Sequence, residues 1–338
     1  MLILGVESSC DETALALVKD GKKVLASLIA SQTDIHAKWG GVIPEIAARE
    51  HLVAIREMYQ QLLRETSTNP QHIDAIAVTQ GPGLIGCLLV GASFAKGLSQ
   101  SSGKPLIPVN HVHAHVHGAL LGIDVPFDQI FPTLALVVSG GHTNLYYMRS
   151  PIEFELLAHT IDDACGESFD KVGKMMGLPY PGGPHVETLA RSGKPGLVPM
   201  PRMMERKNQL LLSYSGLKTA VSHALRDMEK NHYRKEDVAH AFQEEALGQI
   251  VRKLAAARTI RPDSKSVIVA GGVASNTRFR ALIAGQFSLP AYFPPLKYCS
   301  DNGAMIAAMA YYQGQASLSP GWDVYSRYPF ERFLAKDL

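Results

Sequence analysis

The chain presents the same succession of segments twice, and this repeat limits the possible folds more than any other feature. Residues 1–31 contain three short apolar runs separated by polar turns, one of them built on Asp20-Gly21, a hairpin pair. Residues 131–159 have the same rhythm, with a glycine turn between the first two runs. Helix, strand, helix and strand are predicted after each meander. The sequence therefore predicts a duplicated α/β fold with two lobes around a central cleft.

Composition excludes several classes of protein. The 338 residues are 46% hydrophobic and 19% charged, which is typical of a soluble α/β enzyme. The net charge of +2 restricts any nucleic-acid contact to a local patch. The four cysteines are far apart and form no CxxC pair, which argues against disulfides and a thiolate zinc site. No basic leader or bilayer-length apolar run is present, so we expect a cytoplasmic protein without a membrane partner.

Four histidines in "HVHAHVHG" form the most unusual motif of the chain. The apolar residues of the segment favour a helix, on which His111 pairs with His115 and His113 pairs with His117. Either pair could hold a metal ion if a third ligand were present. Val112 occupies the position of the glutamate in a metalloprotease H-E-x-x-H motif, so that chemistry is excluded.

The segment "YCSDNGAMIAA" offers a third ligand in Asp301, at the expected start of the last helix. Aspartate is also a preferred helix cap. The residues alone leave both roles open, and they leave open which histidine pair binds a metal.

Two glycine turns and one helix–turn segment are candidates for a nucleotide site. Backbone N–H groups in "VVSGGHT" and "AGGVASN" could bind phosphate oxygens, although most glycine turns serve only the fold. In "SFDKVGKMMGLPYPGGPHVE", Asp170 and Glu187 flank a glycine surface on which an adenosine could lie. A capped helix followed by a loop is the alternative.

The predicted topology resembles the actin-like superfamily of sugar kinases, actin and chaperone ATPases. We expect an amino-terminal lobe at 1–110 and a carboxy-terminal lobe at 111–300 with a helical insertion at about 150–235. The last helix, about 302–315, is expected to pack back on the first lobe, and residues 316–338 would form a tail.

Ordered motifs across almost the whole chain resemble the TsaD family of tRNA N6-adenosine threonylcarbamoyltransferases. They are "GVESSCDET", "GGVIPEIAAREH", "GPGLIGCLLVG", "HVHAH", "LVVSGGHT", "SFDKVGKMMGLPYPGGP", "SYSGLKT", "AGGVASN" and "CSDNGAMIA". The resemblance implies transfer of a threonylcarbamoyl group from threonylcarbamoyl-AMP to N6 of adenosine 37 in tRNAs that read ANN codons. An actin-like ATPase or kinase, or a scaffold subunit, is the alternative.

The resemblance also assigns site residues. It implies metal ligands at His111, His115 and Asp301, and an acidic pair required for activity at Asp11 and Glu12. The adenylate would contact nine further positions: Val137, Val138, Ser139, Gly140, Gly141, Asp170, Gly183, Glu187 and Asn276. Relatives often carry aspartate where this chain has Glu187.

The resemblance implies one Fe²⁺ per subunit acting as a Lewis acid, although zinc accepts the same ligands. It also implies two protein partners, a shorter TsaB-type paralogue and a TsaE-type P-loop ATPase.

The stretch between Arg191 and Lys235 is the most basic of the chain. It is a candidate tRNA-backbone site, and a solvated helical face is the alternative. Its basic residues are Arg191, Lys194, Arg202, Arg206, Lys207, Lys218, Arg226, Lys230, Arg234 and Lys235.

Overall fold

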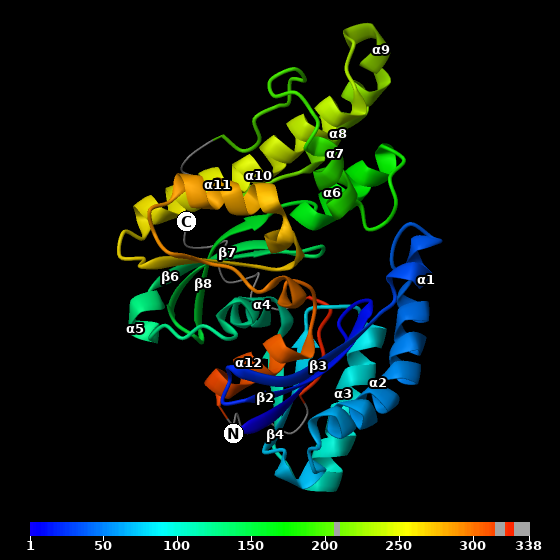
Figure 1. Ribbon diagram of the computed structural model, residues 1–338, viewed down its shortest axis with the longest axis vertical. Coiled ribbons are helices and arrows are strands. Elements are labelled where there is room, and N and C mark those ends of the chain that lie inside the picture. The colour runs from blue at the N-terminus through cyan, green and yellow to red at the C-terminus, as the bar shows by residue number, and fades with distance from the viewer. Residues whose placement is uncertain (206–209, 315–321, 328–338) are drawn as a thin grey trace. The chain divides into compact units, whose positions relative to one another are not determined.

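The chain folds into two compact units, each built on a mixed β-sheet (Figure 1). Unit 1 combines residues 1–125 with 294–338, and unit 2 comprises residues 126–293. The computed structural model describes residues 1–205, 210–314 and 322–327.

Unit 1 contains a five-stranded sheet in the order β3-β2-β1-β4-β5. The first three strands form the predicted antiparallel meander, and β4 and β5 run parallel to β1. The central strand β1 reads as a nearly continuous apolar run because both of its faces are covered. The strands are β1 (Leu2–Glu7), β2 (Glu12–Lys19), β3 (Lys23–Ser31), β4 (Ala75–Gly81) and β5 (Leu106–Asn110).

Alternate residues of β1 face different helices, as the period of a strand requires. Leu4 and Val6 pack with α2 and α3, whereas Gly5 meets the first turns of α12. The helical segments of unit 1 are α1 (Thr33–Ala37), α2 (Pro44–Thr66), η1 (Pro70–His72), α3 (Ile85–Ser102), α4 (His111–Leu120), η3 (Leu296–Tyr298) and α12 (Gly303–Gln313).

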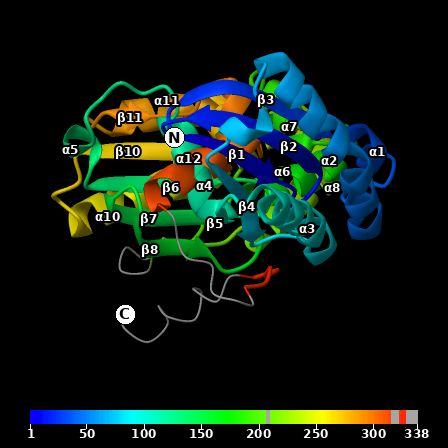
Figure 2. The same ribbon diagram turned by 90° about the horizontal axis from the view of Figure 1, so that it is seen from below.

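Unit 2 repeats this sheet, which confirms the predicted duplication. Its order is β11-β10-β6-β7-β8-β9, in which β6, β7 and β8 form the meander and β10 and β11 run parallel to β6 (Figure 2). The two-residue strand β9 extends the edge beside β8. The strands are β6 (Thr133–Val138), β7 (Thr143–Ser150), β8 (Glu153–Thr160), β9 (Leu211–Leu212), β10 (Ser266–Ala270) and β11 (Ala291–Tyr292).

Unit 2 differs from unit 1 mainly by additional helices between β8 and β10. The longest, α10, packs against α7 and α8 and reaches the sheet at β6. The helical segments are α5 (Phe127–Ile130), α6 (Cys165–Met175), α7 (Gly182–Ala190), α8 (Ser215–Arg226), α9 (Met228–Asn231), α10 (Lys235–Ile260), η2 (Gly272–Ser275) and α11 (Thr277–Gln286).

The boundaries of the units differ from those expected at 110/111 and 300/301. They fall at 125/126 and 293/294, because α4 packs against α12 and both helices contact the sheet of unit 1. Of the predicted tail at 316–338, only residues 322–327 are among those described. No helix within the described parts of the chain has the length and apolar character needed to cross a bilayer.

Helix α12 approaches β1 and β2 closely because a glycine stands at the contact. A Cβ atom on Gly303 would lie 2.6 Å from the amide nitrogen of Ala16 and 2.8 Å from the carbonyl oxygen of Gly5. Backbone atoms cannot move aside as a flexible side chain can. The contact therefore excludes any larger residue at this position.

We predict that Gly303→Ala lowers the free energy of unfolding by about 1–3 kcal/mol or more through overpacking. Gly285→Ala is the matched control, since a Cβ at this position in α11 meets nothing within 4 Å. It should be neutral or stabilise by up to about 1 kcal/mol. Urea denaturation measures both, and equal midpoints for the two variants would contradict the proposed close contact.

Candidate functional site

The histidine motif forms the helix α4, as its periodicity predicts. Asn110 caps this helix, since its side-chain oxygen accepts the N–H of His113. The helix begins directly at the end of β5, and nearly all of it is buried. His111 and His115 therefore lie one turn apart on the same face, with ring centroids 4.8 Å from each other.

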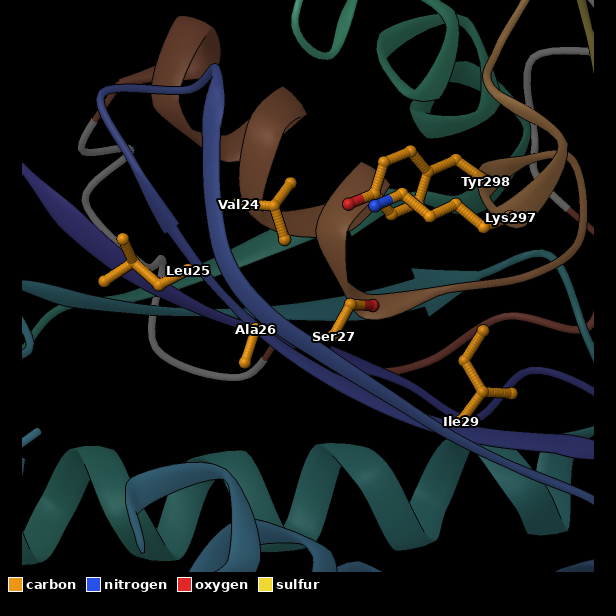
Figure 3. Close-up of a pocket in the computed structure, with 7 residues that line it drawn as sticks. All are labelled: Val24, Leu25, Ala26, Ser27, Ile29, Lys297 and Tyr298. Atoms are coloured by element: carbon orange, nitrogen blue, oxygen red, sulfur yellow. The ribbon is translucent and has the colours of Figure 1, made fainter. Parts of the chain in front are cut away.

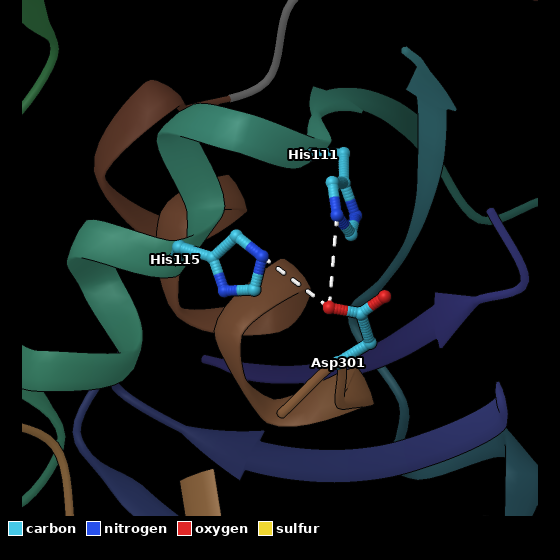
Figure 4. A group of neighbouring side chains, drawn as sticks. All are labelled: His111, His115 and Asp301. Carbon is cyan, nitrogen blue, oxygen red and sulfur yellow. Dashed lines mark ion pairs between the residues drawn. The ribbon is translucent and has the colours of Figure 1, made fainter. Parts of the chain in front are cut away.

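Asp301 joins these two histidines in unit 1 (Figure 4). Its Oδ1 atom lies 3.3 Å from Nε2 of His115 and 3.7 Å from Nε2 of His111. The cap of α12 is the next residue, Asn302, whose side chain accepts the N–H of Met305. The capping alternative for Asp301 is therefore wrong, and its carboxylate faces the imidazoles.

The environment of His115 fits a metal ion. The side chain is buried, yet neither ring nitrogen has a hydrogen-bond partner in the described part of the chain. Such a group is costly to bury unless something else binds it. Two imidazoles and one carboxylate, with ligand atoms within 4.8 Å of one another, form a donor set that suits Fe²⁺ or Zn²⁺.

Glu7, a residue that the sequence analysis missed, holds the second imidazole in place. This fully buried carboxylate lies 3.0 Å from Nδ1 of His111 and accepts hydrogen bonds from Ser9 N–H and the Thr79 hydroxyl. A carboxylate on the far nitrogen fixes the orientation of a metal-binding histidine and makes it a better ligand. The only signal in the sequence is an acidic residue at the end of an apolar strand.

Electrostatics couple Glu7 to His111. Burial raises the pKa of Glu7, but the charge of His111 and its hydrogen bond outweigh burial and lower it. For His111, burial opposes protonation, but Glu7 and Asp301 raise the pKa to about 9. The cluster thus favours positive charge at His111, and a bound cation would supply such charge as well.

The acidic pair Asp11 and Glu12 lies at the start of β2 in the same unit. Burial raises the pKa of Glu12 to about 10, with further contributions from Asp301, Asp11 and Glu7. Burial and the neighbouring carboxylates therefore favour the neutral form of Glu12.

His51 fastens the loop that carries this acidic pair. Its Nδ1 lies 2.7 Å from the Thr13 hydroxyl, and its Nε2 lies 2.9 Å from the carbonyl oxygen of Cys10. These bonds join the motif "GGVIPEIAAREH" on α2 to the motif "GVESSCDET" at the β1–β2 turn. The sequence analysis did not assign His51 a role.

The other two histidines of α4 lie outside the metal cluster. Burial and the nearby His117 lower the pKa of His113 to about 3. His117 is fully buried and stacks on Tyr312 of α12, with ring centroids 5.4 Å apart. His117 thus contributes to the packing of α4 against α12.

In unit 2, the β6–β7 turn leaves two glycines open to solvent. A Cβ atom on Gly140 or Gly141 would meet nothing within 4 Å, so the fold itself does not require glycine there. Neither N–H group has a hydrogen-bond partner within the described residues. Ser139 holds the turn, because its N–H donates to the carbonyl of His142 and its hydroxyl accepts the N–H of His142.

Two further residues among the predicted adenylate contacts, Asp170 and Glu187, also serve the fold. Asp170 accepts the N–H groups of Gly182 and Gly183 at the start of α7, at 2.8 and 3.3 Å. Oε1 of Glu187 accepts the N–H and hydroxyl of Thr277, which leaves Oε2 without a partner among the residues described. The Glu187 carboxylate thus retains one oxygen for a ligand.

Asn276 caps α11 by accepting the N–H of Phe279, and it donates to Gln243. One amide hydrogen and one lone pair of its side chain remain available. Short contacts connect the corners of this region, since Gly271 approaches the Val138 backbone and Gly166 approaches the Ser139 backbone. The predicted adenylate residues of unit 2 therefore lie at adjoining turns.

Most basic residues of the 191–235 stretch that are described have acidic or carbonyl partners. Five form ion pairs: Arg191 with Glu187, Arg202 with Glu205, Lys218 with Asp163, Arg226 with Asp227, and Arg234 with Asp237. Lys235 donates to the carbonyl of Met176. Arg206 and Lys207 lie outside the described residues. The pairing reduces the positive charge that this stretch offers to a polyanion.

A separate hollow lies along the edge strand β3 (Figure 3). Five residues of β3 line it together with Lys297 and Tyr298, and none of the predicted site residues does. The ammonium of Lys297 lies 4.9 Å from the centre of the Tyr298 ring. The hollow is therefore distinct from both candidate sites.

Comparison with known proteins identifies the family. The model of TsaD, tRNA N6-adenosine threonylcarbamoyltransferase, matches residues 23–308. The chain belongs to the TsaD family. A protein named tRNA N6-adenosine threonylcarbamoyltransferase in Moorella thermoacetica is 46% identical over 92% of this chain and 91% of its own length. Another protein of the same name in Kosmotoga olearia is 47% identical over 92% of this chain and 93% of its own length.

Solved structures confirm the predicted actin-like fold. HypF from T. kodakarensis matches with a TM-score of 0.61 at 14% identity, over 92% of this chain and 47% of that one. The ROK hexokinase from Thermus thermophilus matches with a TM-score of 0.50 at 16% identity, over 93% of this chain and 99% of the hexokinase chain. At these identities the likeness concerns the fold alone. The TsaD chain thus shares its architecture with sugar kinases.

The buried His51 predicts how the stability of this TsaD protein depends on pH. Burial lowers the pKa of His51 below its ordinary 6.5, although Cys10, Glu7 and Asp11 oppose this effect and His36 adds to it. Below that pH the unfolded chain binds a proton that the folded chain rejects. The free energy of unfolding should therefore fall as the pH drops below about 6.5, by at most about 1.4 kcal/mol per pH unit for this group.

Urea denaturation between neutral and mildly acidic pH measures this slope. A His51→Gln variant lacks the titrating group and should lose less stability over the same interval, whatever its starting stability. Parallel curves for the two proteins would contradict the prediction.

Proposed function

We propose that this TsaD-family enzyme transfers the threonylcarbamoyl group of threonylcarbamoyl-AMP to N6 of adenosine 37 in tRNAs that read ANN codons. Membership of the family makes it a t6A-forming tRNA N6-adenosine threonylcarbamoyltransferase. The cluster of His111, His115 and Asp301 is the observation that supports this chemistry most directly. A kinase would hold Mg²⁺ through carboxylates and phosphates and would not require two buried imidazoles.

We propose that His111, His115 and Asp301 hold one Fe²⁺ per subunit, and zinc would accept the same ligands. Such an ion would supply Lewis-acid polarisation of the threonylcarbamoyl carbonyl. Glu7 would accept the hydrogen of His111 Nδ1 and so keep Nε2 available as a ligand. The position of His115 supports this assignment, because neither ring nitrogen has a hydrogen bond among the described residues and Nε2 faces Asp301.

We propose that unit 2 binds the adenylate through the turns described above. The open N–H groups of Gly140 and Gly141 suit phosphate oxygens, as in other backbone anion sites. The free Oε2 of Glu187 suits a ribose hydroxyl, and the remaining amide hydrogen of Asn276 offers a further donor. Ser139, Asp170 and Gly183 would shape the surrounding surface. Val137 and Val138 are fully buried in β6, so they would support the turn from beneath it.

The attacking amine of the adenosine must lose a proton during the transfer, and AMP must leave. We propose that the Asp11 carboxylate accepts this proton. Glu12 remains protonated because of its burial and its carboxylate neighbours, so it acts as a hydrogen-bond donor to Asp11. Since the adenylate is already activated, the other residues mainly orient the two substrates.

We propose further that the enzyme acts in the cytoplasm with a TsaB-type paralogue and a TsaE-type ATPase. Four apolar side chains exposed on α2 and α3 support docking of a paralogue on unit 1: Leu52, Val53, Ile85 and Leu89. Clusters of exposed apolar residues commonly mark protein interfaces.

We predict that His111→Ala weakens metal binding by at least about 100-fold, more than the loss of a supporting residue. Formation of t6A by the reconstituted system should be lost in parallel. His113→Ala is the matched control, because this histidine is on the same helix but outside the cluster. Metal content and t6A formation are the measurements. Full activity of the His111→Ala enzyme would refute the proposed chemistry.

We predict that Gly183→Ala leaves stability unchanged but weakens binding of AMP or an adenylate analogue by about 10-fold or more. The added Cβ meets nothing within 4 Å in the protein, so it would instead crowd the ligand. A clash of this kind costs on the order of 1–3 kcal/mol. Calorimetric titration and thermal denaturation measure the two effects. Gly285→Ala is the control and should change neither the affinity for AMP nor the fold. Equal AMP affinities for the Gly183→Ala and Gly285→Ala variants would contradict the proposed adenylate site at Gly183.

A further inference from the structure

Trp39 is 63% exposed, which makes it the most exposed tryptophan, tyrosine or phenylalanine among the described residues. It lies in the short turn between α1 and α2, just before the motif "GGVIPEIAAREH" (Figure 1). Large aromatic rings are normally placed where they can bury much of their area. An exposed tryptophan on a surface turn is therefore a candidate contact for a ligand or partner.

The turn that carries Trp39 is held firmly from within. His36 is completely buried, and its Nδ1 accepts the N–H of Ile43, so its Nε2 carries a hydrogen and donates to Gln32. The N–H of Trp39 donates to the carbonyl of His36 at 2.9 Å. The backbone of Trp39 is thus positioned in advance, which lowers the entropy lost when a ligand covers its ring.

The same turn is fastened to the acidic pair. The N–H of Gln32 donates to the carbonyl of Asp11 at 3.0 Å, and its side-chain amide donates to the carbonyl of Ala47 on α2. Trp39, Asp11 and the metal cluster all belong to unit 1. The backbone of Trp39 is therefore connected, through three hydrogen bonds by way of His36 and Gln32, to the loop that carries the proposed proton acceptor.

The neighbours of Trp39 distinguish between two kinds of partner. Ala37, Lys38 and Gly40 are exposed beside it, and Gly40 has a positive φ of 67°. Val42 and Ile43 of the same turn are partly buried, so Trp39 is the only large apolar side chain of this described turn that is mostly exposed. A protein interface usually surrounds its aromatic anchor with exposed apolar area. One flat ring with an adjacent lysine instead suits an unpaired base and its phosphate.

We infer that Trp39 is a stacking platform for an unpaired base of the tRNA substrate, and that Lys38 contacts the neighbouring phosphate. This inference rests on the proposed function, because it locates where the enzyme grips the single-stranded loop that it modifies. The stacked base would be separated from its neighbours, which helps to present the target adenosine.

The chain contains two tryptophans, so fluorescence can isolate Trp39. The other, Trp322, packs under the ammonium of Lys96 and can be replaced by phenylalanine. In the full-length Trp322→Phe protein, an RNA hairpin with a tRNA anticodon loop should quench the remaining emission. A blunt RNA duplex of equal length should not, because its bases are already stacked.

Substitution of Trp39 gives the second test. Trp39→Ala should weaken hairpin binding by between about 5-fold and about 150-fold, the range for one stacked base. Trp39→Phe should retain most of the affinity, and both variants should bind the metal and AMP normally. Anisotropy of a labelled hairpin provides these affinities, and thermal denaturation confirms that the exposed site tolerates the changes.

Three results would overturn the inference. The first is hairpin binding without any change in Trp39 emission, and the second is equal affinity for wild type and Trp39→Ala. The third is a blue shift of Trp39 emission caused by a partner protein alone, which would assign the ring to a protein interface. In each case t6A formation by the wild-type enzyme would still support the proposed function. If the wild type neither bound nor modified tRNA, the proposed function itself would fail.

Discussion

The contact of α12 with the rest of unit 1 is the constraint on which the candidate metal site depends. Gly303 allows this helix to lie directly on the backbone of β1 and β2. Helix α4 then packs along α12, with His117 stacked on Tyr312. Since Asp301 immediately precedes α12 and His111 begins α4, this packing brings together ligands from distant parts of the sequence. A displacement of α12 would therefore move Asp301 relative to the two imidazoles.

Charge balance is the second property of this site. The carboxylates of Glu7 and Asp11 are buried, those of Glu12 and Asp301 are partly buried, and the imidazoles of His111 and His115 lie beside Asp301. These surroundings favour a proton on Glu12 and another on His111. A divalent ion would supply the same charge without those protons, so metal affinity and proton affinity in this cluster compete.

The sequence predicted the architecture well, because the repeat follows from local patterns such as the hairpin at Asp20-Gly21. It left the role of Asp301 open because aspartate and asparagine are both common helix caps. Only the position of the first turn of α12 shows that Asn302, and not Asp301, is the cap. Glu7 was missed because it reaches His111 only through the pairing of β1 with β4 and of β4 with β5. A pairing between distant strands leaves no local pattern in the sequence. The ion pairs of the basic stretch could not be predicted for a related reason, since Asp163, Asp237 and Glu187 lie outside that stretch in the sequence and pair with it only in the fold.

The division of the chain into units also affects the order in which the protein can fold during synthesis. Unit 2 is one continuous segment, whereas unit 1 needs both ends of the polypeptide. One face of β1 therefore stays without its covering helix until the ribosome has made residues 303–313. The lobe that is begun first is completed last, so a nascent chain leaves this apolar sheet surface uncovered until α12 has been made.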